Sequence, residues 1–131
     1  FINLSSLLTS RDNIRQSVAN LFVLRKSLAN MVSASGGEAI PVDENIVRFS
    51  GHSLGGMVGT NYLAFDDTVG AASFFMPGGG IAQLLNGSES FGPKIRTGLE
   101  AKGVSAGTPE FDAFFIAAQT VLDSADPINF G

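Results

Sequence analysis

The first third of the chain has the apolar spacing of one long amphipathic helix. Apolar side chains recur every three or four positions: Ile14, Val18, Leu21, Leu24 or Arg25, Leu28 and Val32. The opposite face is polar and includes Arg11, Arg15, Gln16, Asn20 and Lys26. Thr9 or Ser10 is expected to cap this helix, because a hydroxyl there accepts a hydrogen bond from a free backbone N–H. The glycines of residues 35–37 should end it.

The next stretch predicts a strand, a sharp turn and a second helix. Residues 46–49 are Ile-Val-Arg-Phe and predict a short strand that leads directly into the glycine-rich residues 51–56. Apolar positions in residues 57–65 then suit a helix, and Gly56 and Gly59 leave one of its sides bare. A helix with a bare side can lie close to the neighbouring strands.

A second strand and three further helices complete the pattern. Residues 69–76 are small and apolar, which predicts a strand buried on both faces. Helical segments are expected at residues 81–85, 93–102 and 109–122, the last with a proline at its start. The order of strand, helix and strand predicts an α/β fold whose strands are parallel and joined by a right-handed crossover.

The composition is that of a folded chain and excludes several functions. The 131 residues are 44% hydrophobic and 15% charged, which is unlike a disordered protein. The net charge is −4 and the eight basic residues are scattered, so we expect no nucleic-acid partner. There is no cysteine, which excludes a disulfide scaffold and a thiol nucleophile. No motif in the sequence requires a metal ion or a cofactor.

Residues 51–55 are Gly-His-Ser-Leu-Gly, the G-x-S-x-G pattern of a nucleophile elbow. In such an elbow the serine lies on a tight turn between a strand and a helix, where a strained backbone holds its Oγ clear of the sheet. Gly51 and Gly55 are expected to remove side chains that would collide as strand and helix approach. The Leu54 N–H, at the helix N-terminus, would donate to the oxyanion formed in acyl transfer. Ser53 is therefore the predicted nucleophile.

The alternative interpretation is a glycine-rich turn with an idle serine, or one that cradles a phosphate. The dinucleotide pattern G-x-G-x-x-G and the P-loop pattern G-x-x-x-x-G-K-[ST] are both absent around Ser53. The position of Ser53 between a predicted strand and a predicted helix favours the nucleophile.

Three stretches together resemble one enzyme family. Residues 51–56 (Gly-His-Ser-Leu-Gly-Gly), which follow residues 46–50 (Ile-Val-Arg-Phe-Ser), look like the elbow of α/β-hydrolase lipases. Residues 1–4 (Phe-Ile-Asn-Leu), which lead into residues 11–16 (Arg-Asp-Asn-Ile-Arg-Gln), and residues 120–127 (Thr-Val-Leu-Asp-Ser-Ala-Asp-Pro) resemble bacterial extracellular lipases and phospholipases of the Pla-1/cef type. The similarity covers essentially the whole chain, but only the middle of such an enzyme.

The resemblance implies a fold, a substrate class and a location. Residues 1–79 would be part of the α/β-hydrolase core, with the elbow, and residues 80–131 a helical cap or lid that returns toward the sheet. Lipid esters would be the substrates: triacylglycerols, phospholipids or lysophospholipids. The enzyme would be secreted by a bacterium or bound to its surface.

A serine nucleophile needs a base, and this chain offers only one imidazole. His52 is the sole histidine, and its side chain should diverge from that of Ser53 in a tight elbow, where it would be hydrogen-bonded beside the turn. The family order is serine, acid, histidine, so the base and the acid are expected downstream of residue 131. Asp123 and Asp126 are more simply helix caps or solvated charges. The upstream strands of the sheet and a second oxyanion donor are also expected outside the chain.

The segment after the second strand allows two interpretations. As a lid over an acyl-chain pocket, residues 80–122 would use a set of apolar side chains: Phe91, Phe111, Phe114, Phe115, Ile116, Val121 and Leu122. Five glycines, at positions 87, 92, 98, 103 and 107, would let it move. Alternatively, these apolar residues are ordinary core positions of helices packed on the sheet.

The sequence therefore predicts a serine carboxylester hydrolase, a lipase or phospholipase, present as an incomplete fragment that is inactive alone. A non-catalytic binding or structural module on a hydrolase scaffold is the alternative, since no usable histidine is present. The open edges of a two-stranded sheet also suggest association with a second copy.

Overall fold

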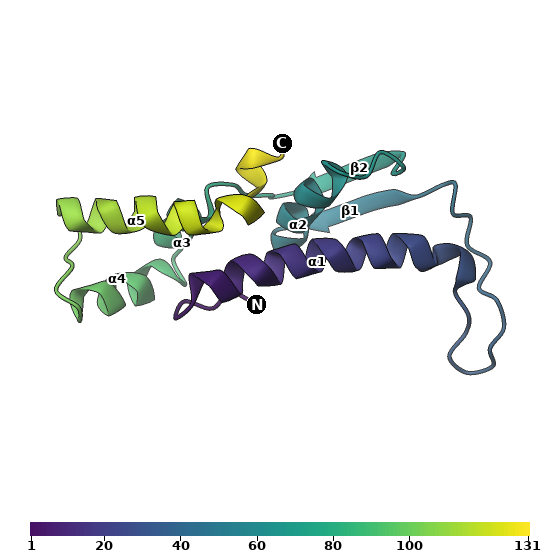
Figure 1. The fold of residues 1–131 in the computed structure, drawn as a ribbon, viewed down its shortest axis with the longest axis horizontal. Helices are drawn as coiled ribbons and strands as arrows, with labels where there is room; N and C mark the ends of the chain where they lie inside the picture. The colour runs from purple at the N-terminus through teal and green to yellow at the C-terminus, as the bar shows by residue number, and fades with distance from the viewer.

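Five α-helices and a two-stranded parallel sheet follow one another in a computed structural model that describes residues 1–131 (Figure 1). In chain order, the elements are α1 (Leu7–Ser27), β1 (Arg48–His52), α2 (Leu54–Leu63), β2 (Ala71–Phe75), α3 (Ile81–Gly87), α4 (Gly92–Glu100) and α5 (Pro109–Leu122). Three 3-10 turns accompany them: η1 (Leu28–Asn30), η2 (Asp123–Ala125) and η3 (Pro127–Asn129). The predicted mixed α/β class is confirmed.

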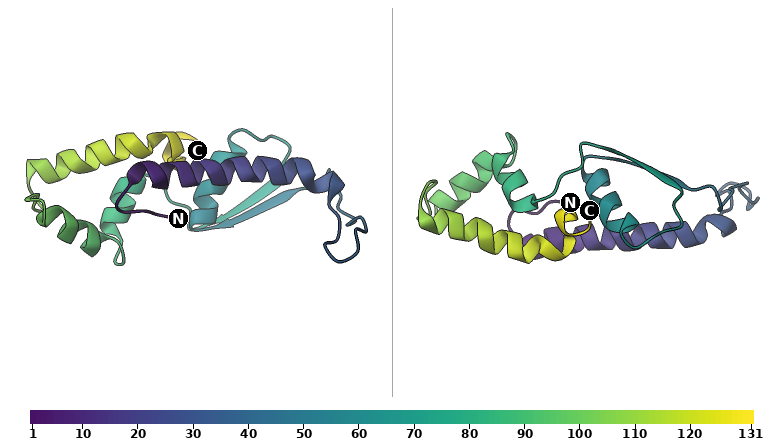
Figure 2. Two further views of the ribbon diagram at one scale, coloured as in Figure 1. Left: turned by 60° about the horizontal axis from the view of Figure 1, so that its bottom comes forward. Right: turned by 90° about the horizontal axis from the view of Figure 1, so that it is seen from above.

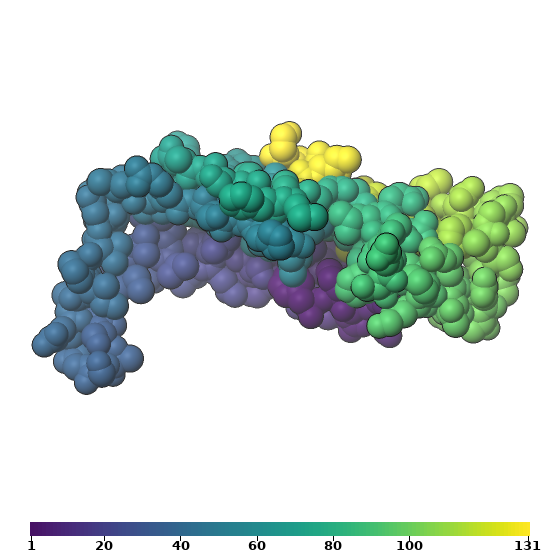
Figure 3. Space-filling model, turned by 180° about the vertical axis from the view of Figure 1, so that it is seen from behind, coloured from purple at the N-terminus to yellow at the C-terminus, as the bar shows by residue number.

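The molecule is elongated, and α1 runs along most of its length (Figures 1 and 2). The sheet and α2 lie over one half of α1, while α3, α4 and α5 gather at the other end. Residues 31–46 project as an arm beyond the sheet, which the space-filling view in Figure 3 shows clearly. None of the helices is both long enough and apolar enough to cross a membrane.

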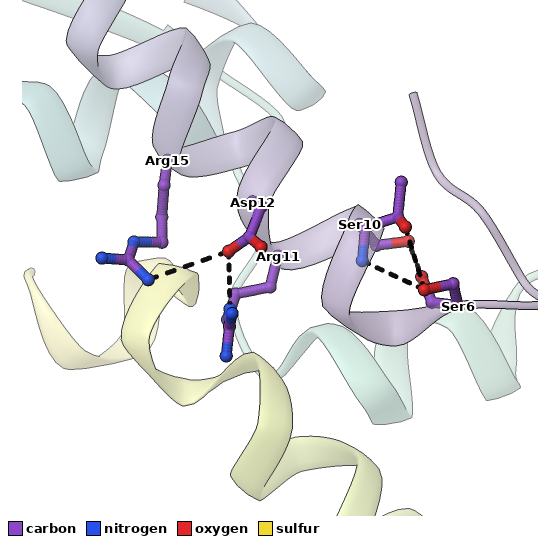
Figure 4. A network of polar contacts seen from close by, with 6 residues as sticks. Ser6, Ser10, Arg11, Asp12 and Arg15 are labelled. Carbon is purple, nitrogen blue, oxygen red and sulfur yellow. Dashed lines mark hydrogen bonds and ion pairs between the residues drawn. The ribbon is translucent and has the colours of Figure 1, made fainter.

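Helix α1 begins earlier than its sequence suggests. Its cap is Ser6, whose Oγ accepts a hydrogen bond from the Thr9 N–H at 3.3 Å. Ser10 is instead buried inside the first turn, where its Oγ accepts from the Asn3 N–H at 2.8 Å and lies close to Ser6 (Figure 4). The predicted cap at Thr9 or Ser10 is therefore wrong, because the Asn3–Ser6 turn brings an earlier hydroxyl to the free N–H groups.

The far end of α1 also differs from the prediction. The helix ends at Ser27 and continues as η1 to Asn30, well before the glycines of residues 35–37. Those glycines lie in the turn of the projecting arm, which an isolated antiparallel bridge between Val32 and Ala39 closes. Along the predicted apolar face, Ile14 is fully buried and Leu24 is half exposed. The helix therefore packs inward as far as Leu21 and Phe22, and its last turn is largely exposed.

Strands β1 and β2 pair in parallel, as predicted, in a register that runs from Arg48 opposite Ala71 to His52 opposite Phe75. β1 begins two residues later than expected and includes Gly51 and His52. The expectation that the second strand is buried on both faces is wrong: every residue of β2 is exposed, and Phe75 is 56% exposed. The reason is that α2 packs on one face of the sheet and no helix covers the other (Figure 2).

The hydrophobic core lies where α1 and α2 meet the helical end of the molecule, which is formed by α3, α4 and α5. It has twelve buried residues: Ile14, Met57, Val58, Ile81, Ala82, Leu85, Leu99, Phe111, Phe115, Ala118, Leu122 and Ala125. Nine of these belong to residues 80–131 and three to residues 1–79. The two predicted segments thus share one core.

Candidate active site

Ser53 is the single residue between the last residue of β1 and the first residue of α2. Its backbone has φ 51° and ψ −117°, a region that residues with a side chain rarely adopt. Such a conformation costs on the order of 1–3 kcal/mol and persists only where the surroundings enforce it. Here the Ser53 N–H donates to the Phe75 carbonyl at 2.9 Å, and the Ser53 carbonyl accepts from the Met57 N–H at 3.0 Å. The predicted strained turn is present.

Gly51 has the steric role that the motif predicts. A Cβ at this position would lie 2.6 Å from the Gly55 carbonyl oxygen and 2.9 Å from the Gly56 nitrogen. Both are backbone atoms of the elbow and cannot move aside like the end of a flexible side chain. Only glycine therefore fits at residue 51.

Two helix glycines allow the close approach of α2 to the sheet. A Cβ at Gly59 would lie 2.8 Å from the Phe74 ring and would also overlap the Phe49 ring. A Cβ at Gly56 would lie 3.1 Å from the Cβ of Pro77, which follows β2. The prediction that these glycines form a bare side of the helix agrees with this packing.

Gly55 does not behave as expected. A Cβ built at this position meets no atom within 4 Å, so within these residues the glycine relieves no collision. The reason is that Gly55 lies on the exposed side of the first turn of α2, away from β1. Of the two predicted elbow glycines, only Gly51 is required by the packing of this chain.

The hydroxyl of Ser53 is free for chemistry. The residue is exposed, and although it occupies the cap position of α2, its side chain makes no capping hydrogen bond. Leu54 is the first residue of α2, so its N–H has no acceptor within the helix. The positive end of the α2 dipole also stabilises negative charge near the Leu54 N–H. An exposed hydroxyl thus lies beside a helix N-terminal N–H that has no acceptor within the helix.

His52 supplies no base to Ser53. The residue is exposed at the end of β1, and its imidazole makes no hydrogen bond, either to Ser53 or to another group beside the turn. The hydrogen bond that was expected beside the elbow is not formed. No other imidazole is present.

Asp126 has a larger role than the sequence indicates. It is fully buried, and its carboxylate accepts hydrogen bonds from the N–H groups of Gly80 at 2.9 Å and Ile81 at 2.6 Å. Two more donors complete the site, the Gln119 side-chain amide at 2.7 Å and the Ile128 N–H at 3.1 Å. Of the two expected alternatives, a cap or a solvated charge, the cap is confirmed at η3. The hydrogen bonds to the start of α3 were not predicted.

The signal for this cap was local. Asp126 precedes Pro127, and a carboxylate followed by proline is the pattern of a helix N-cap. Its second role, at the start of α3, joins residues 45 positions apart and has no local signal. Asp123, by contrast, is exposed, and its carboxylate accepts only from the Gln119 amide, at 2.9 Å.

Asp126 and the elbow hold opposite ends of one loop. Residues 76–80 leave β2 beside Ser53, pass Gly56 at Pro77, and reach Asp126 at Gly80. Met76, at the start of this loop, has φ 50° and is 80% exposed. The structure therefore brings together a strained serine, a free helix N-terminus and an anchored loop, but no acid and base.

The expected lid residues differ in burial, and Val121 is half-buried. Phe111, Phe115 and Leu122 are core residues of α5, as the second interpretation predicts. Phe91 and Phe114 pack against this core at partial exposure, whereas Ile116 is 71% exposed.

Comparison of the chain with protein-family models, with curated proteins and with solved structures gives no match.

Proposed function

We propose that residues 1–131 are part of a serine ester hydrolase in which Ser53 is the nucleophile. The observation that carries this proposal is the backbone of Ser53, held at φ 51° between a parallel strand and a helix, with its hydroxyl exposed and unbonded. Strain of this kind persists in proteins mainly where function uses it. An idle serine at such a turn would be replaced by glycine without cost.

The chemistry follows from this placement. The Ser53 Oγ attacks the carbonyl carbon of an ester, its proton passes to a base, and the carbonyl oxygen becomes an oxyanion beside the Leu54 N–H. Collapse of the tetrahedral intermediate expels the alcohol, and water then releases the acid. One donor of this type typically contributes about 3 kcal/mol to transition-state stabilisation.

The base in this proposal is a histidine outside residues 1–131, oriented by an acid that is also outside them. His52 is the only histidine of the chain and does not bond to Ser53. Residues 1–131 alone are therefore proposed to be inactive toward esters. The uncovered face and the open edges of the sheet offer places where the strands that bring these groups could pack.

We extend the proposal to the family and the substrate class. The elbow sequence and the flanking stretches favour the middle of an α/β-hydrolase lipase or phospholipase of the bacterial extracellular type, acting on lipid esters outside the cell or at its surface. In that arrangement residues 1–79 belong to the hydrolase core and residues 80–131 form the helical cap. No cofactor takes part in this mechanism.

The second candidate is a non-catalytic module on the same scaffold, and the absence of a base at Ser53 favours it. The two candidates differ in whether the Ser53 hydroxyl reacts with an ester. Association of two copies through the exposed β2 edge is a related proposal. Light scattering tests it directly, because a strictly monomeric mass at all concentrations would contradict it.

A fluorophosphonate probe on the natural full-length protein tests the main proposal. Labelling is expected at Ser53 and should be lost in Ser53→Ala. Ser50→Ala is the matched control, since Ser50 is also exposed and lies in β1 only three residues away; this variant should label like the parent. An unlabelled protein with native circular dichroism would favour the non-catalytic module.

A further inference from the structure

A pocket lies away from the elbow, among α3, α4, α5 and the N-terminal segment. Its volume is about 500 Å³, within the range of roughly 300–1,000 Å³ that small-ligand pockets occupy. None of the elbow residues lines it. Leu85, Leu99 and Phe115 form part of its buried apolar wall.

Two of the three lysines of the chain line this one pocket. Lys94 lies in the first turn of α4, and Lys102 follows in the turn after that helix. Neither forms an ion pair, since the only ion pairs of the molecule join Asp12 to Arg11 and Arg15 (Figure 4). No aspartate or glutamate lines the pocket. In a chain of net charge −4, two unpaired cations beside an apolar hollow are a local excess of positive charge.

Gly98, a residue of α4, lies between the two lysines in the sequence. It lines the pocket, and a Cβ built on it meets no atom within 4 Å. A side chain added at residue 98 would therefore begin in open space at the edge of the pocket.

We propose that this pocket binds a free long-chain fatty acid. The apolar interior would take the hydrocarbon chain, each buried methylene of which contributes about 0.8 kcal/mol, and the carboxylate would pair with Lys94 and Lys102. Ammonium–carboxylate hydrogen bonds are among the stronger polar contacts of proteins. The inference stands apart from the proposed hydrolysis, because the site contains neither Ser53 nor Leu54.

The test is displacement of cis-parinaric acid, a fluorescent fatty acid, by oleate and by oleyl alcohol. It uses the natural full-length protein carrying Ser53→Ala, so that no acyl enzyme can form. Oleate is expected to bind saturably, and Lys94→Gln with Lys102→Gln should weaken it about tenfold while leaving oleyl alcohol unchanged. Lys26→Gln, which removes the third lysine outside the pocket, is the matched control and should have no effect.

Gly98→Phe gives a second, independent readout. The new ring has space to enter the pocket without a backbone clash, so oleate and oleyl alcohol should both lose binding while the circular dichroism stays native. Failure of oleate to displace the probe would overturn the proposal. So would equal binding of oleate by the parent and the double lysine variant, because the cations would then play no part. Either result is independent of whether Ser53 reacts with a fluorophosphonate.

Discussion

The helical end of the molecule, made of α3, α4 and α5, contributes most of the buried core, whereas β2 at the sheet end exposes its apolar side chains. At the helical end, Ile81 and Leu122 are almost fully buried, and the start of α3 is capped by Asp126. At the sheet end, Phe75 and Met76 are largely exposed, and the strained Ser53 lies at the tip of β1. Stability is therefore expected to reside in the helical end, while the sheet end holds the strained turn and an uncovered apolar surface.

The largest expected difference in unfolding free energy is between alanine substitutions of two large apolar residues, one from each end of the molecule. Leu122→Ala should cost about 4 kcal/mol of unfolding free energy, because the side chain is fully buried and leaves a cavity. Phe75→Ala should cost less than about 1 kcal/mol, since the ring is more than half exposed. Urea unfolding measures both. Equal losses would break the comparison and show that the sheet end also supports the fold.

The next largest loss of stability is expected for the substitution of Asp126. Asp126→Ala leaves the buried N–H groups of Gly80 and Ile81 without acceptors, which should cost about 3 kcal/mol. Asp123→Ala is its control, because Asp123 is exposed and accepts a single side-chain bond; it should change stability by less than about 0.5 kcal/mol. Thermal unfolding of the two variants side by side provides the check. If Asp126→Ala unfolds at the same temperature as the parent protein, the buried carboxylate is not what anchors α3.

Within the sheet end, alanine substitutions of the two elbow glycines should have clearly different effects on stability. Gly51→Ala forces a methyl group against the backbone of Gly55 and should cost about 2–3 kcal/mol. Gly55→Ala meets no atom and replaces a helical glycine, so it should stabilise the protein by up to about 1 kcal/mol. Chemical denaturation of both variants tests the assignment. A destabilised Gly55→Ala would indicate that a further segment packs against residue 55 in the intact protein.

The smallest expected effect concerns Tyr62, a buried residue of the sheet end. Burial, with a hydrogen bond from its hydroxyl to Asp66, raises its pKa from 10.0 to about 12. The folded state therefore holds this proton more tightly than the unfolded state. The resulting stabilisation is complete below pH 10 and is lost as the pH rises through 12, by roughly 2 kcal/mol.

Tyr62→Phe provides the comparison, because it keeps the ring packed against Phe22 and Phe49 but has no proton to lose. Unfolding free energies should converge for the two proteins as the pH rises from 10 to 12. If the unfolding free energies of the two proteins change in parallel with pH, the pKa of Tyr62 is not raised.

Much of the fold was predictable because its signals are local. The helix α5, the parallel pair of strands and the turn at Ser53 all lie close to where periodicity and the glycine motif place them. Gly51 was also predictable, since its collision is with residues only four and five positions away. The cap of α1 was misplaced because three hydroxyl-bearing residues, Ser6, Thr9 and Ser10, compete within one turn.

The order of the elements and the strained serine between a strand and a helix follow from the sequence alone, because they depend on neighbouring residues. Which apolar residues are covered depends on how the elements pack in three dimensions. The small apolar composition of β2 predicts burial, but burial depends on elements that pack on both faces, and one face has none. Likewise, the buried state of Asp126 arises from N–H groups 45 positions away, which no local pattern specifies.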